Sequence, residues 1–153
     1  MENLSKYDAI LVCNYEDMVN ESDERSASST PMGGTYGTTT YWNWDDPKLY
    51  AGNAFGRLIQ QELNSWKQGF SAKVTDFYKW IVVDVSYHHH VTGRTASKTF
   101  LIVFNGGPKG NDKGGGMVLS TANKWRSISG VSQATSYIKS ACGSLEQSTS
   151  QKL

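Results

Sequence analysis

The stretch FYKWIVVDVSYHHHVTGRTASKTFLIVF, residues 77–104, holds two long apolar runs separated by a short polar segment. Apolar residues alternate with others along the first run, which predicts an extended strand over Phe77–Val91 with one buried face. The segment Thr92–Ser97 is rich in turn formers. The run Thr99–Phe104 is apolar on both faces, so we expect it to pair antiparallel with the first strand and to be covered on both sides. The residues expected on the buried face of the first strand are Phe77, Ile81, Val83, Val85, Tyr87 and Val91.

Apolar residues on both faces of a sheet need more cover than one layer of helices provides. On the second face, Tyr78 and Trp80 and one side of the run Thr99–Phe104 require a covering layer. Three sources remain open: the N-terminal segment, a second copy of the chain, or a protein partner. Tyr78 and Trp80 are therefore candidate interface residues.

The chain has 153 residues, enough for a single domain with a substantial core, which we expect to span residues 1–145. It has no 18-residue apolar run and no basic-then-apolar leader, so neither a membrane span nor a secretory signal is expected. Cys13 and Cys142 fit no metal-binding spacing. Two free thiols and a cytoplasmic location are the expectation.

The net charge of +1 conceals an asymmetry between the two parts of the chain. Residues 1–50 contain three basic and nine acidic residues, whereas residues 51–153 contain twelve basic and five acidic ones. Such a split suggests an intramolecular pairing or a basic surface that contacts a polyanion; solvated charges without a role are the alternative.

Outside residues 77–104, the run Tyr7–Tyr15 is β-prone and apolar enough at its centre for an interior strand. Residues 16–40 are first acidic and then rich in Ser, Thr and Gly, which predicts a mobile loop. Trp42 and Trp44 follow, either as core residues or as a stacking platform. Residues 146–153 read as a flexible C-terminal tail.

Two helices are expected. Asp46-Pro47 predicts the start of the first, whose apolar stripe runs to Gln68, with Gly69 as its C-cap. Ser129 is expected to cap the second, over Gly130–Cys142. Met117–Thr121 adds a further candidate strand. The predicted fold is α+β, with a mainly antiparallel sheet of three to five strands and two helices packed on one face.

The triplet His88-His89-His90 is the clearest candidate for metal chemistry, because His88 and His90 would share one face of a strand. The chain has no other histidine, so a hydrogen-bonded or exposed strand end is the simpler interpretation, and no metal or cofactor is expected. The loop Asn105–Gly116 is rich in glycine and carries Lys109 and Lys113, which suits a phosphate contact. No nucleophile motif is present, which favours a protein that is not an enzyme.

The order helix, three strands, helix over roughly residues 47–145 resembles double-stranded RNA-binding domains. Thr92-Gly93 with Phe100 seven positions after the glycine, and the glycines of 106–116, carry the resemblance. Ala96 stands where that family has a histidine, and Gly130–Gln133 replaces its basic helix start, so the RNA contacts of the family do not transfer. The helix followed by Lys79–Val82 and a hairpin also resembles Tctex-type dynein light chains, which implies dimers that hold cargo peptides.

Taken together, these patterns favour a non-enzymatic binding protein whose basic C-terminal two-thirds contacts a polyanion, RNA in particular. A protein-interaction or homo-oligomeric module built on Tyr78 and Trp80 is the alternative, and a metal-dependent hydrolase at His88 and His90 comes third. The residues expected to contact nucleic acid are Arg94, Lys98, Lys109, Lys113, Lys124 and Arg126.

Overall fold

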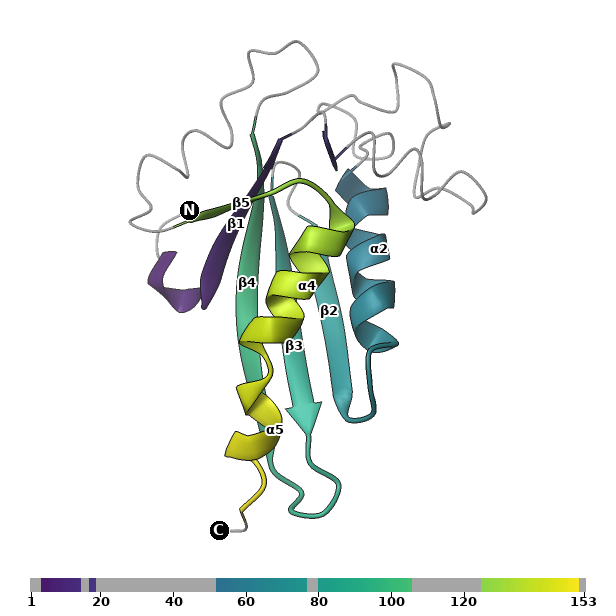
Figure 1. Ribbon diagram of the computed structural model, residues 1–153, viewed down its shortest axis with the longest axis vertical. Helices are drawn as coiled ribbons and strands as arrows, with labels where there is room; N and C mark the ends of the chain where they lie inside the picture. Colours follow the sequence, from purple (N-terminus) through teal and green to yellow (C-terminus); the bar gives the residue numbers. More distant parts are fainter. Residues whose placement is uncertain (1–3, 15–16, 19–51, 77–79, 106–124, 152–153) are drawn as a thin grey trace.

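The computed structural model describes residues 4–14, 17–18, 52–76, 80–105 and 125–151 (Figure 1). These residues form one five-stranded sheet in the order β2-β3-β4-β1-β5, with helices α2 and α4 on one face (Figure 1). The predicted α+β class is therefore confirmed. The elements are η1 (Leu4–Lys6), β1 (Ala9–Asn14), α2 (Gly52–Asn64), β2 (Phe70–Asp76), β3 (Trp80–His88), β4 (Thr95–Asn105), β5 (Arg126–Ile128), α4 (Val131–Ala141) and α5 (Ser144–Ser148).

Strands β3 and β4 form the expected antiparallel hairpin, with Ile81 opposite Ile102 and His88 opposite Thr95. The alternation of β3 is confirmed, because its odd-numbered residues from Ile81 to Tyr87 are buried and the residues between them are only half-buried. The strand is shorter than expected and ends at His88. Val91 is not on the buried face but 60% exposed, since the chain reverses between His89 and Arg94.

Strand β4 is buried on both faces, as its sequence predicts. Phe100, Ile102 and Phe104 face the helices and join the main core. Leu101 and Val103 face the other way, where they form a second cluster with Ile10. The partly buried residues that pack against this second cluster are Leu4, Tyr7, Trp80 and Val82. The N-terminal segment, one of the three expected sources of cover, thus covers part of the second face.

Strand β1 confirms the interior strand predicted within Tyr7–Tyr15. It pairs parallel with β4 on one side, with Ala9 opposite Phe100, and parallel with β5 on the other, with Leu11 opposite Arg126. Its four central residues are buried, as expected for a strand covered on both faces. The sheet is consequently mixed, with an antiparallel part made of β2, β3 and β4.

Both helices present the predicted stripes to the sheet. Phe55, Ile59 and Leu63 of α2 are buried, and so are the corresponding residues of α4. Gly56 allows α2 to approach the sheet closely, because a Cβ atom there would lie 3.0 Å from Val74 Cγ1. The expected cap at Ser129 is wrong: Gly130 occupies the N-cap of α4 and makes no side-chain capping bond. The expected helix start at Asp46-Pro47 lies outside the described residues.

Four described elements were not expected from the sequence: η1, β2, β5 and α5. Strand β2 pairs with β3 along its whole length, with Phe70 opposite Tyr87. Helix α5 (Ser144–Ser148) overlaps the predicted C-terminal tail. Leu145 and Thr149 are buried, and the carbonyl of Thr149 accepts a hydrogen bond of 2.7 Å from Thr92 Oγ1. These contacts hold the end of the chain against the β3–β4 turn.

Several predictions concern residues that the structure does not describe. These are most of the loop 16–40, the Trp42 and Trp44 cluster, the glycine-rich loop from 106 and the strand 117–121. Within the predicted loop, Met18 is described and is fully buried in the main core. No helix in the described part of the chain is long and apolar enough to span a membrane.

The helix, three strands, helix order implied by the double-stranded RNA-binding resemblance is not reproduced in the described residues, because β5 lies between β4 and α4 in the chain. The described order is α2, β2, β3, β4, β5 and α4. Strand β2 was not among the predicted strands, and the predicted strand Met117–Thr121 lies outside the described residues.

Gly69 and Gly93 both adopt positive φ angles, of 95° and 75°. We expect Gly69→Ala to destabilise the protein by about 2–4 kcal/mol, because left-handed strain adds to a clash in which the new Cβ lies 2.5 Å from Tyr87 Cε1. Gly93→Ala is the matched control, since nothing lies within 4 Å of its Cβ, and it should cost only about 1 kcal/mol. Urea denaturation measures both; equal losses would contradict the close contact with Tyr87.

Candidate functional site

Two of the six expected nucleic-acid contacts are engaged with the protein backbone. Arg94 Nη1 donates a hydrogen bond of 2.8 Å to the carbonyl of Gln151, and Lys98 Nζ donates one of 2.8 Å to the carbonyl of Ala141. Each cation therefore satisfies a carbonyl group near the C-terminus. Lys109, Lys113 and Lys124 lie outside the described residues.

The charge of Lys98 also influences the pKa of a buried thiol at the end of α4. Cys142 is the C-cap residue of that helix and is fully buried. Burial raises the pKa of its thiol to about 11; the charge of Lys98 opposes this effect and that of Asp8 adds to it. A thiol with this pKa is protonated at neutral pH and is a weak nucleophile. Cys142 is therefore a core residue.

Arg126 has different surroundings from the other two described cations. It begins β5, is exposed, and its guanidinium carbon lies 4.9 Å from the centre of the Tyr137 ring. Arg126 pairs with Leu11 of β1, and Leu11 pairs with Ile102 of β4. Arg126 therefore lies two strands from β4, at the level of Ile102, which is four residues beyond Lys98 on that strand. Standard strand spacings place the Cα atoms of Arg126 and Lys98 roughly 16 Å apart. Arg126 and Lys98 therefore do not lie side by side on the sheet.

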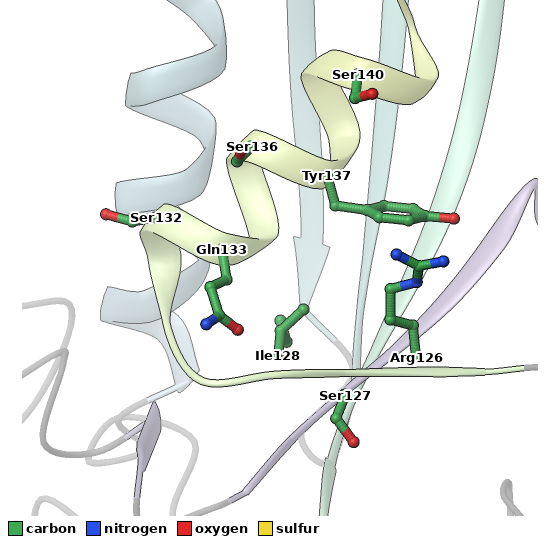
Figure 2. Close-up of a pocket in the computed structure, with 8 residues that line it drawn as sticks. All are labelled: Arg126, Ser127, Ile128, Ser132, Gln133, Ser136, Tyr137 and Ser140. Atoms are coloured by element: carbon green, nitrogen blue, oxygen red, sulfur yellow. The ribbon is translucent and has the colours of Figure 1, made fainter.

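A pocket of about 570 Å³ lies beside Arg126, between β5 and α4 (Figure 2). Strand β5 and the connection to α4 form one wall, and one side of α4 forms the other (Figure 2). The helix presents two rows of polar residues at four-residue spacing, which brings each row onto one face. The lining residues are Arg126, Ser127, Ile128, Ser132, Gln133, Ser136, Tyr137 and Ser140.

Most of the side chains that line this pocket carry a polar group, and none of the described lining residues is acidic. Arg126 is the one charged residue among them, and Tyr137 supports its guanidinium through a cation–π contact. Gln133 Oε1 accepts a hydrogen bond of 2.9 Å from the backbone N–H of Ser129. The guanidinium, amide and hydroxyl groups of the lining can bind a small polar or anionic group.

Of the three expected cations that the structure describes, Arg126 lines this pocket and Arg94 and Lys98 do not. Sequence reasoning missed the other lining residues because serines four residues apart on an exposed helix usually face solvent without a role. The available signal was the segment Trp125-Arg126-Ser127 directly before that helix, together with the Ser132, Ser136, Ser140 spacing.

The three histidines do not adopt the geometry proposed for a metal site. His88 ends β3, and its Nδ1 atom lies 3.0 Å from Thr95 Oγ1. His90 lies in the turn rather than on the strand, and its ring stacks against His89 with the ring centres 5.8 Å apart. In the described ranges, no group of three or more His, Cys, Asp or Glu residues is arranged to hold a metal ion.

Of the two expected interface residues, Tyr78 lies outside the described residues. Trp80 is half-buried and packs against the second cluster on the sheet face away from the helices. It lies opposite Val103 in the β3–β4 register. Trp80 is thus partly a structural residue, and part of its surface remains accessible.

The raised pKa of Cys142 generates a prediction on stability. The unfolded thiol ionises near pH 9.0 and the folded thiol near 11, so the unfolded state loses its proton first. Stability should fall as pH rises between these values, by about 2–3 kcal/mol from this group. Cys142→Ala removes the titrating group, so the difference in unfolding free energy between wild type and variant should shrink by that amount from pH 9 to 11. Urea denaturation at several pH values would contradict the burial argument if the difference stayed constant.

Comparison of the chain with protein-family models, with characterised proteins and with solved structures finds no match. The function of the pocket between β5 and α4 must therefore be inferred from its own residues.

Proposed function

We propose that this chain is a non-enzymatic binding protein that contacts a polyanion, RNA in particular, through the pocket between β5 and α4. The observation that carries the proposal is Arg126, whose guanidinium rests on Tyr137 in a pocket with no acidic residue among its described lining residues. Among the described residues, Arg126 has no ion pair or hydrogen bond that would occupy its donors. A guanidinium held by an aromatic ring in this way is well suited to bind phosphate.

An exposed aromatic residue next to Arg126 in the sequence favours RNA over a simple anion. Trp125 directly precedes Arg126 and is 48% exposed, one of two large apolar side chains exposed in the described part of the chain. Single-stranded nucleic acids bind proteins through phosphate contacts combined with stacking of bases on such rings. A base on Trp125 and a phosphate at Arg126 would use both kinds of contact.

The proposed set of phosphate-contacting cations is smaller than the set of six expected from the sequence. Arg94 and Lys98 hold backbone carbonyls and are left out of the contact set. Arg126 and the undescribed Lys109, Lys113 and Lys124 remain. With about 0.7 counterions released per neutralised phosphate, the logarithm of affinity should fall with the logarithm of salt concentration with a slope near −2.8, rather than about −4 for six contacts.

The test is a titration of single-stranded RNA at two salt concentrations. We expect Arg126→Gln to weaken binding by roughly 5- to 30-fold, because a charge-assisted contact contributes about 1–2 kcal/mol. The salt slope should become shallower by about 0.7. Fluorescence anisotropy of a labelled oligonucleotide measures both quantities.

Lys73→Gln is the matched control, because Lys73 is an exposed cation on β2, at the opposite edge of the sheet. It should change affinity by less than about twofold, as expected for a distant surface charge. The proposal would be rejected if the wild-type protein formed no salt-sensitive complex, or if the two variants lost affinity equally.

The remaining exposure of Trp80 favours a second candidate function, a homo-oligomeric or protein-interaction module that uses the second sheet face. Trp80 and Val82 are only partly buried although they adjoin the fully buried Leu101 and Val103. A partner would complete the burial of this apolar strip.

For this second candidate, light scattering of the wild type should give the mass of a dimer, and Trp80→Asp should convert it to a monomer, since a carboxylate cannot be buried cheaply in an apolar interface. Circular dichroism of the variant checks that the fold survives. A monomeric wild-type protein at micromolar concentration would remove the oligomer from consideration.

A further inference from the structure

Strand β2 is the outermost strand of the described sheet on the side away from β5. In its antiparallel ladder with β3, the carbonyl of Gly69 accepts a hydrogen bond of 3.0 Å from His88 N–H. Because alternate residues of such a ladder bond to the neighbouring strand, the peptide groups of Ala72 and Val74 point away from β3. An edge strand of seven residues with outward peptide groups is a template for pairing with another chain.

Side chains of α2, which runs alongside β2, bind these outward peptide groups (Figure 1). Asn64 Oδ1 accepts a hydrogen bond of 2.8 Å from Ala72 N–H, and Asn64 Nδ2 donates one of 3.2 Å to the Ala72 carbonyl. Gln60 Oε1 accepts a hydrogen bond of 2.8 Å from Val74 N–H. Two successive outward N–H groups of the edge strand are therefore bonded to a helix rather than open to a further strand.

The two α2 side chains make the bonds that a neighbouring strand would make. Paired residues of antiparallel strands exchange two N–H···O bonds, and the Asn64 amide exchanges both with Ala72. Gln60 and Asn64 are four residues apart, or about 6 Å along a helix, whereas Ala72 and Val74 are two residues apart, or about 6.6 Å along a strand. Because these spacings match, successive amides of α2 reach successive outward peptide groups of β2.

We infer that the side chains of Gln60 and Asn64 form an amide clasp that closes the β2 edge against strand addition, and that the strand it excludes is β2 of a second copy of the chain. Identical edges can pair antiparallel about a two-fold axis, so every copy of the chain is a potential partner. Strand β2 and Arg126 of β5 lie at opposite sides of the described sheet, so the inference does not depend on the proposed RNA binding.

Hydrogen exchange carried out in dilute protein and read by NMR tests each bond of the clasp. Asn64→Ala should speed exchange of the Ala72 N–H by about fivefold, the factor expected for one lost hydrogen bond, and should leave Val74 unchanged. Gln60→Ala should speed exchange at Val74 instead. Alanine has a higher helix propensity than either amide residue, so faster exchange would not reflect a weaker α2.

Gln61→Ala is the matched control for hydrogen exchange, because it removes an exposed amide from the same helix. It should change the exchange rate of neither Ala72 nor Val74. The clasp is overturned if both N–H groups exchange in the Gln60→Ala and Asn64→Ala variants as they do in the wild type.

The double variant Gln60→Ala/Asn64→Ala tests strand addition. Its average mass in light scattering should rise with concentration, to about twice the wild-type value at the same concentration once pairs form. Comparison with the wild type at each concentration removes the effect of any dimer through the second sheet face. Adding Ala72→Pro takes an outward N–H from the edge and should return the mass to the wild-type value, since edge strands tolerate proline.

The outcomes separate the clasp from its effect on association. Faster exchange in the single variants without a rise in the mass of the double variant keeps the hydrogen bonds but overturns the exclusion of a second copy. A rise that persists after Ala72→Pro, with circular dichroism showing an intact fold, assigns the association to another surface and also overturns the inference.

Discussion

Burial of strand β4 on both faces is the constraint on which the rest of the structure depends. Its five residues from Phe100 to Phe104 are almost completely removed from solvent and together contribute roughly 10 kcal/mol of gross hydrophobic free energy. That amount is comparable to the net stability of a typical domain. A strand of this kind must lie inside the sheet, which requires a neighbour on each side and a covering layer on each face.

The parallel pairing of β1 with β4 meets this requirement and also creates the candidate site. Since β1 is apolar on both faces, it can occupy the interior position beside β4. Strand β5 then pairs with the free side of β1 and becomes the last strand of the described sheet. Arg126 is thereby brought to the edge of the sheet beside α4, where the pocket forms (Figure 2).

Basic residues counted along the sequence overestimate the basic surface. Lys98 lies on β4 and Arg94 directly precedes that strand, and each donates to a backbone carbonyl more than 40 positions away in sequence. Such bonds hold the C-terminal segment on β3 and β4, together with the bond from Thr92 to Thr149. A cation whose donors bind carbonyl groups has fewer of them available for a phosphate. Two of the basic residues in the C-terminal two-thirds of the chain, Arg94 and Lys98, therefore hold the C-terminal segment in place and add little to a free basic surface.

The sequence by itself determined the features that depend on local periodicity: the alternation of β3, the two-sided burial of β4, the apolar run of β1 and the helix stripes. It did not reveal β2, whose seven residues contain only three inward-facing apolar side chains, nor α5, which is a single short turn anchored by distant contacts. Tertiary structure alone decided the strand order, the partners of Arg94 and Lys98, and the orientation of Gln133. These depend on distances between atoms that the chain brings together only on folding, and residue order carries no direct record of such distances.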